Sequence, residues 1–432
     1  MSAASSSAAP ADTAQRLIEL MRAQGFDGAQ VSVSRQRRSE VCVAHNEASL
    51  LRSTDTHRLQ LVGLLDGRRA ATDASEIGDE QLQATVRSLW ESVASAPQDA
   101  ANAVSAGQHA RIVRGRAQAE LAELADATGA LLAYREREAP SVMLEEMAVA
   151  HNSSWSSTLT SAGTDLACEL HWFDAGAFGL ARDGTQASSF NYAGGNCESL
   201  ADAPLITRFG MADLLQSLPR QTRTERIGER FVGSVVLTPK AMADLVGWLL
   251  GQLADQALID GSSVYRDAVG QLVASPLLSL RHRTDAPGVS PLTADAFVAA
   301  PVELIAQGRL QCLTPSLYGS RKTGLPHVPL VAEGWDMAAG ATPRDALIAG
   351  VPRGALVDRL SMGRPAASGD FSGVIKNSFL IDHGRVGAAL AETMISGNVA
   401  QMLRDVQAVS AERIDTGGWV LPWVRVEGLH FS

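Results

Sequence analysis

Tight-turn signals between apolar segments are the feature that most constrains the fold of this 432-residue chain. Asp66-Gly67, Asp183-Gly184 and Asp382-His383-Gly384 each interrupt a sequence with the alternating pattern or the β-branched content of strands. Asp-Gly favours turns that join neighbouring antiparallel strands, because glycine adopts positive φ without strain. The 38 glycines of the chain agree with many such turns. The sequence therefore predicts antiparallel sheets.

Helical periodicity appears between these strands. One helix is expected to open at Asp12 and to end near Gly25, and another is predicted over residues 116–127. A further helix is expected from Asp79, with an apolar face formed by Leu82, Val86, Leu89 and Val93. Helices interspersed among antiparallel strands are typical of an α+β fold.

The second half of the chain opens with a strand–helix unit. A strand over residues 232–237 is followed by Thr238-Pro239 and a helix to Ala254, with threonine as N-cap and proline at the first helical position. The charged segment 219–229 marks a domain boundary before it. We expect a disordered tail (1–14), an N-terminal α+β domain (15–225) and a C-terminal, largely antiparallel β domain with flanking helices (226–432).

Two local patterns are interpreted as turns. The basic segment 35–38 separates two short alternating runs and is expected to be the tip of a hairpin. The glycine pairs Gly194-Gly195 and Gly417-Gly418 are isolated, and we expect each of them to lie in a turn.

Composition excludes several functions. A net charge of −10 argues against nucleic-acid binding, which needs a concentrated basic surface. The most apolar stretch, residues 245–259, is too short and too polar to cross a membrane. The first dozen residues lack the pattern of a signal peptide, so a cytoplasmic protein is expected.

Motifs of familiar enzymes are missing from the sequence. It contains no GxSxG elbow, no phosphate-binding GxxxxGK[ST] loop and no GxGxxG fingerprint. The nearest two histidines are twelve residues apart, so no helical turn can present a pair of imidazoles to a metal ion. The four cysteines are also far apart and are expected to be inert thiols.

Three segments nevertheless resemble the TldD/PmbA family. They are the strand–helix unit 233–252 with the following Gly-Ser-Ser-Val-Tyr-Arg, the Leu-Tyr-Gly-Ser-Arg-Lys-Thr-Gly-Leu stretch 317–325, and the C-terminal run from Ala-Ser-Gly-Asp-Phe-Ser-Gly at 367–373 to Ile-Ser-Gly-Asn-Val-Ala-Gln-Met-Leu at 395–403. Their order and spacing match the family from roughly residue 15 to the end. The resemblance implies two domains and a paired assembly that encloses a cavity.

The resemblance also implies a metal-free branch of the family. Catalytic TldD members carry HExxxH on the helix after the first strand of the C-terminal domain, whereas this chain has Gly247, Trp248 and Gln252 at the three motif positions. It also lacks the further cysteine ligand in its last hundred residues. The chain therefore resembles the PmbA (TldE) branch. No metal and no catalytic residue is expected in it, and zinc is expected in an HExxxH-bearing partner subunit.

Three hypotheses for function follow. In the first, the chain is a non-catalytic subunit of a heteromeric zinc metallopeptidase that degrades or matures unfolded peptides, and it supplies cavity wall and an edge strand for the substrate. In the second it is a peptidase with an unorthodox site, and in the third a free-standing peptide-binding or scaffold protein. A heterodimer or higher heteromer, or possibly a homodimer, is expected to bury well over about 1,000 Å².

Candidate substrate-binding residues come from two places. Trp248 lies where catalytic relatives place a metal-motif residue, and simple packing is favoured for it over contact with peptide. The Gly/Pro-rich segment near residue 320 contributes Tyr318, Arg321, Lys322 and His327. The alternative for these four is a solvated connector.

Overall fold

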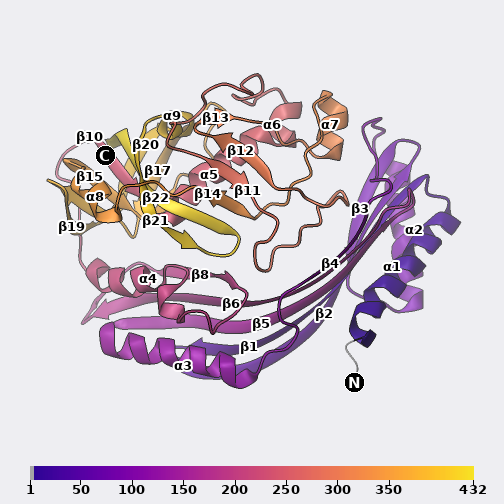
Figure 1. Cartoon of the computed structure of the whole chain (residues 1–432), viewed down its shortest axis with the longest axis horizontal. Coiled ribbons are helices and arrows are strands. Elements are labelled where there is room, and N and C mark those ends of the chain that lie inside the picture. Colours follow the sequence, from indigo (N-terminus) through magenta and orange to yellow (C-terminus); the bar gives the residue numbers. More distant parts are fainter. Residues whose placement is uncertain (1–3) are drawn as a thin grey trace.

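The computed structural model describes residues 4–432, which form two large sheets and the helices that pack on them (Figure 1). The first sheet is long and curved, with the order β3-β2-β1-β5-β6-β4, and both β7 and β8 pair with β6. Its strands are β1 (Gly28–Ala44), β2 (Glu47–Leu65), β3 (Arg68–Ala74), β4 (His109–Arg114), β5 (Val142–Thr160), β6 (Asp165–Asp183), β7 (Gln186–Ala187) and β8 (Asn191–Cys197). All pairings except β4 with β6 are antiparallel, as the turn signals predict.

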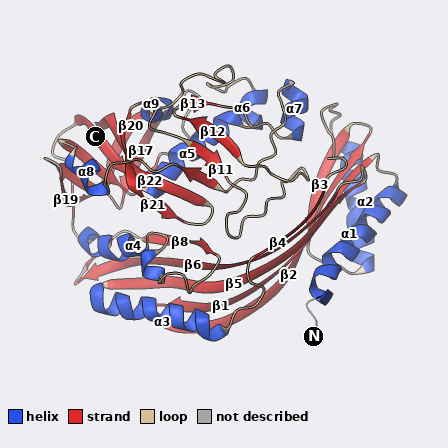
Figure 2. Ribbon diagram, in the orientation of Figure 1, coloured by secondary structure: helices blue, strands red, loops and turns tan. Residues whose placement is uncertain are grey.

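Helices cover the outer face of this curved sheet (Figure 2). They are α1 (Ala4–Gln24), α2 (Asp79–Ser95) and α3 (Leu121–Glu138). The predicted apolar face of α2 is fully buried, and it packs with α1 against β1 and β2. A short helix, α4 (Met211–Ser217), with the turns η1 (Leu205–Thr207) and η2 (Pro219–Gln221), follows β8 and packs beside it.

The second sheet lies over the concave side of the first (Figure 1). Its central order is β11-β14-β22-β10-β15-β18-β19, so the last strand of the chain lies in its middle. Its strands are β9 (Thr224–Glu225), β10 (Phe231–Leu237), β11 (Leu280–His282), β12 (Val302–Ala306), β13 (Arg309–Leu310), β14 (Trp335–Met337), β15 (Arg353–Val357), β16 (Arg359–Ser361), β17 (Asp370–Lys376), β18 (Phe379–Asp382), β19 (Arg385–Leu390), β20 (Thr393–Asn398), β21 (Val406–Asp415) and β22 (Trp419–Phe431). The helices of this half are α5 (Pro239–Leu253), α6 (Asp255–Ile259), α7 (Leu317–Thr323), α8 (Arg344–Ala349) and α9 (Val399–Arg404).

Local signals position several elements correctly. The hydroxyl oxygen of Thr238 accepts a hydrogen bond from Ala241 N at the start of α5, and the Asn398 side chain caps α9 in the same way. Asp66-Gly67 lies in the turn between β2 and β3, and both residues have positive φ. The α+β class with two sheet-based domains is therefore confirmed. Among the described residues, no helix is long and apolar enough to cross a membrane.

Two local predictions need correction. Residues 35–38 form the middle of the 17-residue strand β1 rather than a hairpin tip, and Arg38 pairs there with Glu40 and Asp174. Charged side chains are tolerated in this strand because carboxylates lie beside them, Asp55 on β2 for Arg35 and Arg37, and Glu40 on β1 and Asp174 on β6 for Arg38. Gly194-Gly195 lies inside β8 rather than in a turn, whereas Gly417-Gly418 does join β21 to β22.

The predicted N-terminal tail also differs from the structure. Residues 1–3 lie outside the described part of the chain, but helix α1 begins at Ala4 rather than at Asp12. The segment is rich in alanine, which has the highest helix propensity, so the helix extends further toward the N-terminus than its apolar periodicity predicts. From residue 10 onward the helix packs on the first sheet through Ala14, Leu17, Ile18 and Met21.

Candidate functional site

A cavity of about 1450 Å³ lies between the two sheets and is lined by both halves of the chain. Its floor is the concave face of β1, β5, β6 and β8. Its other walls come from α4, the start of α5, the segment after β15, and the strands β18, β21 and β22. A cavity of this size suits a segment of extended polypeptide or a bulky organic ligand better than a folded domain.

Two neighbouring rows of residues cross the floor. One row consists of small residues that are cross-strand neighbours of one another, namely Cys42, Ala148, Gly176 and Gly194. The next row is Ala44, Glu146, Phe178 and Tyr192. Phe178 and Tyr192 are 38% and 47% exposed, and Phe178 stacks on Phe190, which is 44% exposed, so several partly exposed aromatic rings gather here, as is typical of a surface that meets a ligand or partner. The floor therefore offers bare backbone beside an aromatic pair.

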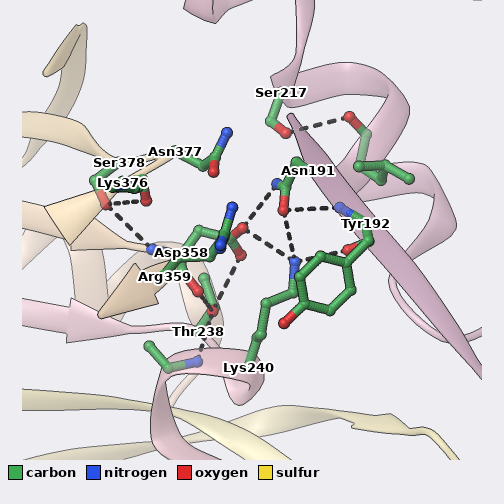
Figure 3. A network of polar contacts seen from close by, with 12 residues as sticks. Asn191, Tyr192, Ser217, Thr238, Lys240, Asp358, Arg359, Lys376, Asn377 and Ser378 are labelled. Carbon is green, nitrogen blue, oxygen red and sulfur yellow. Dashed lines mark hydrogen bonds and ion pairs between the residues drawn. The ribbon is translucent and has the colours of Figure 1, made fainter. Parts of the chain in front are cut away.

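A polar network closes one side of the cavity, and Lys240 lies at its centre (Figure 3). The Lys240 ammonium group donates to Asn191 Oδ1 at 2.9 Å and to the Tyr192 carbonyl oxygen at 2.7 Å, and it lies 3.3 Å from Asp358 Oδ2. It also lies 4.4 Å from the centre of the Tyr192 ring. All three ammonium protons therefore have acceptors, and the first turn of α5 is fixed to β8.

The carboxylate of Asp358 joins three elements. Its Oδ2 atom accepts a hydrogen bond from Asn191 Nδ2 at 2.8 Å, and its Oδ1 atom accepts one from the Thr238 hydroxyl at 3.2 Å. Burial lowers the pKa of Lys240 below its usual value, and the charge of Asp358 opposes this effect. The network is therefore a half-buried ion pair that links the domains, and each of its charged groups has several hydrogen-bond partners.

Asp244 lies one helical turn beyond Lys240 and lines the same cavity. Its side chain is exposed to the solvent of the cavity, and the surrounding cavity wall partly desolvates the carboxyl group. Burial raises the pKa of its carboxyl group to about 6, and Arg359 opposes that shift. Among the described residues, no hydrogen bond or salt bridge to the Asp244 carboxylate is found. Asp244 is therefore a carboxylate of this wall that remains available to a ligand.

Other polar side chains of the wall are differently engaged. Arg344 donates from Nη1 to Asp213 Oδ1 at 3.1 Å, and the Arg220 guanidinium lies 4.4 Å from the centre of the Phe379 ring. Asn377 is 4% exposed and has a φ of 52°, and its Oδ1 atom has no hydrogen-bond partner among the described residues. A buried acceptor without a partner is costly, but the Asn377 Oδ1 atom is enclosed by protein and its Nδ2 donates to Gln221 Oε1 at 3.2 Å, so this amide is a structural group of the wall rather than a contact for a ligand.

The three metal-motif positions on α5 do not fit a zinc ion. Gly247 has no side chain, and a Cβ atom there would point into open space. Trp248 donates from Nε1 to the Ala366 carbonyl oxygen at 3.3 Å, and Gln252 is buried with its Oε1 atom accepting from Val264 N at 3.1 Å. None of these groups is a free nitrogen, sulfur or carboxylate ligand. Among residues 4–432 no group of three or more His, Cys, Asp or Glu side chains could hold a metal ion.

The predicted substrate-binding residues lie away from the cavity. Trp248 packs against the core of the C-terminal domain and does not line the cavity. Simple packing is the interpretation that the sequence favoured for it. Helix α7 carries Tyr318, Arg321 and Lys322, and all three contact the loop after α2 in the N-terminal domain. Their predicted contact with peptide stays a prediction.

The contacts of α7 form a latch between the domains. The Tyr318 hydroxyl donates to Asp99 Oδ2 at 2.8 Å, and the Lys322 ammonium lies 2.8 Å from the same atom. Arg321 donates from Nη2 to the Ala100 carbonyl oxygen at 2.9 Å. His327 lies apart from this group: its Nε2 atom is 3.2 Å from Asp295 Oδ2, and Phe297 packs edge-on to the imidazole with ring centres 4.5 Å apart.

The residues that build the cavity wall were not singled out from the sequence. Lys240 and Asp358 each follow closely on a strand, β10 or β15, and these strands run parallel with Leu237 opposite Val357. Polar residues just beyond the carboxyl ends of parallel strands are a recognised position for function. Both segments carry a polar residue just after a predicted strand, but no local pattern predicts that the two strands are neighbours.

Comparisons with known proteins agree with the expected family. Residues 232–432 match the family model described as the PmbA/TldA metallopeptidase C-terminal domain. Among curated proteins, none matches the chain.

Solved structures share the whole fold. A putative modulator of DNA gyrase from Bacteroides thetaiotaomicron superposes with a TM-score of 0.84 at 18% identity, over 98% of this chain and 98% of that chain. TldE from Thermococcus kodakarensis gives 0.81 at 17% identity, over 97% of this chain and 100% of that chain. A putative modulator of a DNA gyrase from Thermotoga maritima gives 0.76 at 16% identity, over 98% and 100%. At these identities the likeness shows the fold.

Proposed function

We propose that this chain, which belongs to the TldD/PmbA family, is a metal-free, non-catalytic subunit of a TldD/TldE-type metallopeptidase assembly. In this role it binds polypeptide substrate. In this proposal an HExxxH-bearing partner subunit holds the zinc ion and the carboxylate that activates water. The chain described here contributes cavity wall and substrate contacts. The expected compartment is the cytoplasm.

The observation that carries the proposal is the state of helix α5. At its three motif positions stand a glycine, an indole whose N–H is engaged and an amide whose oxygen is engaged. The first turn of the same helix, with Lys240 and Asp244, faces a cavity of about 1450 Å³. At these positions the helix carries no side chain that binds zinc, and its first turn borders a space large enough for a polypeptide segment.

The cavity wall supports polypeptide as the ligand class. Exposed aromatic rings suit apolar side chains, and the unpaired carboxylate of Asp244 suits amines and backbone amides. The charges of the other wall residues are largely paired within the protein, as Arg344 is with Asp213. Such a wall favours an uncharged main chain over a strongly anionic ligand.

Co-expression with an HExxxH-bearing relative tests the proposal. We expect the two chains to elute together, with an interface well above about 1,000 Å², and the purified pair to digest an unfolded protein in a chelator-sensitive way. Each chain alone is the control. A chain that stays separate from every such relative, yet binds peptide, would contradict the subunit role and favour a free-standing binding protein.

A further inference from the structure

An unpaired carboxylate lies on the cavity floor beside an aromatic ring. Glu146 of β5 lines the cavity, and its side chain is exposed. Among residues 4–432, no hydrogen bond or salt bridge reaches its carboxylate group. Its direct cross-strand neighbour is Phe178 of β6, which lines the cavity as well. Side chains of directly opposite residues in an antiparallel pair lie next to each other on one face, so the carboxylate and the ring border the same space.

The Phe178 ring is held in place but remains partly uncovered. Phe190 stacks on it, with ring centres 4.8 Å apart and an angle of 11° between the planes, and Phe178 is still 38% exposed. The aliphatic stem of a long side chain can cover such a ring, and the π-electrons of the ring attract a cation above its face. Lysine and arginine combine an apolar stem with a cationic end, so they match a ring that lies next to a carboxylate.

Each of the five basic residues that line the cavity already has a partner elsewhere in the protein. Three of them pair with carboxylates, in the pairs Arg52–Glu40, Lys240–Asp358 and Arg344–Asp213. The other two contact a ring or a carbonyl oxygen: the Arg220 guanidinium lies over Phe379, and Arg359 donates from Nη1 to the Phe190 carbonyl oxygen at 3.2 Å. Glu146 is therefore left without a cation from this chain.

The charge of the cavity and of the chain also favours a cation. Six acidic residues line the cavity against five basic ones, and the whole chain has a net charge of −10. A cleft with an excess of negative charge concentrates cations and disfavours anions. Asp244 lacks a partner as well, but the charge of Arg359 acts on it, so Glu146 is the better site for a cation.

We propose that Glu146 and Phe178 bind a lysine or arginine side chain of the polypeptide substrate and thereby select basic segments. The aliphatic part of that side chain covers the Phe178 ring, and its ammonium or guanidinium group donates to the Glu146 carboxylate. The pair determines specificity and takes no part in bond cleavage. This inference rests on the proposed function, because it names the class of polypeptide that the cavity accepts.

Peptides that differ in one side chain test this preference. The probe is a peptide of about ten residues, long enough to cross the cavity, with alternating alanine and serine, a C-terminal amide and fluorescein on its N-terminus. Its central residue is lysine in one form and norleucine, which has no ammonium group, in the other. Anisotropy measures binding to the full chain. We expect the lysine form to bind about fivefold more tightly at low salt, because a solvent-open ion pair and a cation–π contact each contribute modestly. The difference should disappear in about 1 M salt, which screens the ion pair.

Two variants of the protein locate the preference. Glu146→Gln keeps the size of the side chain and removes its charge, so this variant should bind both peptides alike at low salt. The matched control is Asp345→Asn, which removes one negative charge from the same cavity at a side chain that is 94% exposed and lies 4.0 Å from Arg344. This control should keep the preference for lysine. If Glu146→Gln does not fold, as judged by circular dichroism, Phe178→Leu takes its place, and the preference should then fall about twofold because the cation–π contact is lost.

The outcomes separate this inference from the proposed function. Equal binding of the two peptides by the unmodified chain at low salt, or a preference that Glu146→Gln leaves intact, overturns the basic-side-chain site and leaves the peptide-binding role standing. The same holds if a norleucine peptide with a free N-terminal amine and fluorescein at its C-terminus binds as tightly as the lysine form, because the site would then hold a chain terminus. Absence of any binding, both by the chain alone and by its assembly with an HExxxH-bearing relative, overturns the proposed function itself.

Discussion

The Tyr318 hydroxyl donates a hydrogen bond to Asp99 Oδ2 over 2.8 Å, and this bond joins the two domains through residues that are 219 positions apart in the chain. Lys322, the backbone N–H of Ala101 and Tyr318 together lower the pKa of Asp99 to about 2. The segment around α7 therefore acts as an interdomain latch.

Replacing Arg321 and Lys322 with alanine should lower the melting temperature by a few degrees, because two of the three latch contacts are lost. Thermal unfolding followed by circular dichroism measures this effect. The control is the double alanine variant of Arg226 and Arg230, whose side chains have no hydrogen bond or salt bridge among residues 4–432. An unchanged melting temperature together with weaker peptide binding would instead assign Arg321 and Lys322 to the substrate.

The Lys240–Asp358 pair should show strong coupling. Lys240→Met and Asp358→Ala each leave a poorly solvated partner unpaired, so each should reduce the free energy of unfolding by about 2 kcal/mol. The double variant should lose less than the sum of the two, since neither charge is then left alone. Urea unfolding of the four proteins gives the cycle. Additive losses would show that the two groups act independently.

Asp244 predicts a pH-dependent difference in stability. Its pKa is raised to about 6 in the folded protein from a usual value of 3.8, so the folded state holds the proton more tightly than the unfolded state. The resulting penalty is absent below about pH 4, grows as the pH rises toward 6 and is complete above it. Asp244→Asn should therefore melt higher than the unmodified chain at pH 8 and alike at pH 4.

The control for this prediction is Asp345→Asn, because the Asp345 side chain lines the same cavity and is 94% exposed. It should show little difference in melting temperature between the two pH values. A higher melting temperature for Asp244→Asn at pH 4 as well as at pH 8 would point to a cause other than titration of this carboxyl group.

Local and non-local features differ in how far they could be predicted. Helix α2 and the turn at Asp66-Gly67 follow from neighbouring residues alone, and both are found as predicted. The prediction of a turn at Gly194 was wrong, because a glycine pair has the same sequence pattern in a turn and in a strand that another backbone approaches. The prediction of a hairpin tip at Arg38 was wrong, because the carboxylate that pairs with Arg38 within the sheet, Asp174, lies 136 residues away in the chain.

The candidate site was the hardest part to predict. Its wall joins Asn191, Lys240 and Asp358, and no periodicity connects residues so far apart in the chain. The family resemblance predicted helix α5 correctly, but the candidate positions that it gave were the three motif positions and not the residues of the first turn, which line the cavity. Contacts between domains decide which residues of α5 face the cavity and which loop α7 meets, and these contacts are absent from any local pattern.

Restoring the metal motif should not create a zinc site. In the triple variant Gly247→His, Trp248→Glu and Gln252→His, the side chain at position 252 replaces a buried amide that accepts from Val264 N, so it points into the core. The further thiolate ligand implied by the family is also missing. The variant should bind less than one zinc per chain, as elemental analysis measures, and should be less stable because a buried hydrogen bond is lost. Stoichiometric zinc in a folded variant would contradict this geometry.

The most direct test of the metal-free subunit role is the zinc content and peptidase activity of the purified chain without any partner. The account predicts far less than one zinc per molecule and no digestion of an unfolded protein, with activity appearing when an HExxxH-bearing relative is added. Stoichiometric zinc together with chelator-sensitive peptidase activity in the partner-free preparation would contradict it.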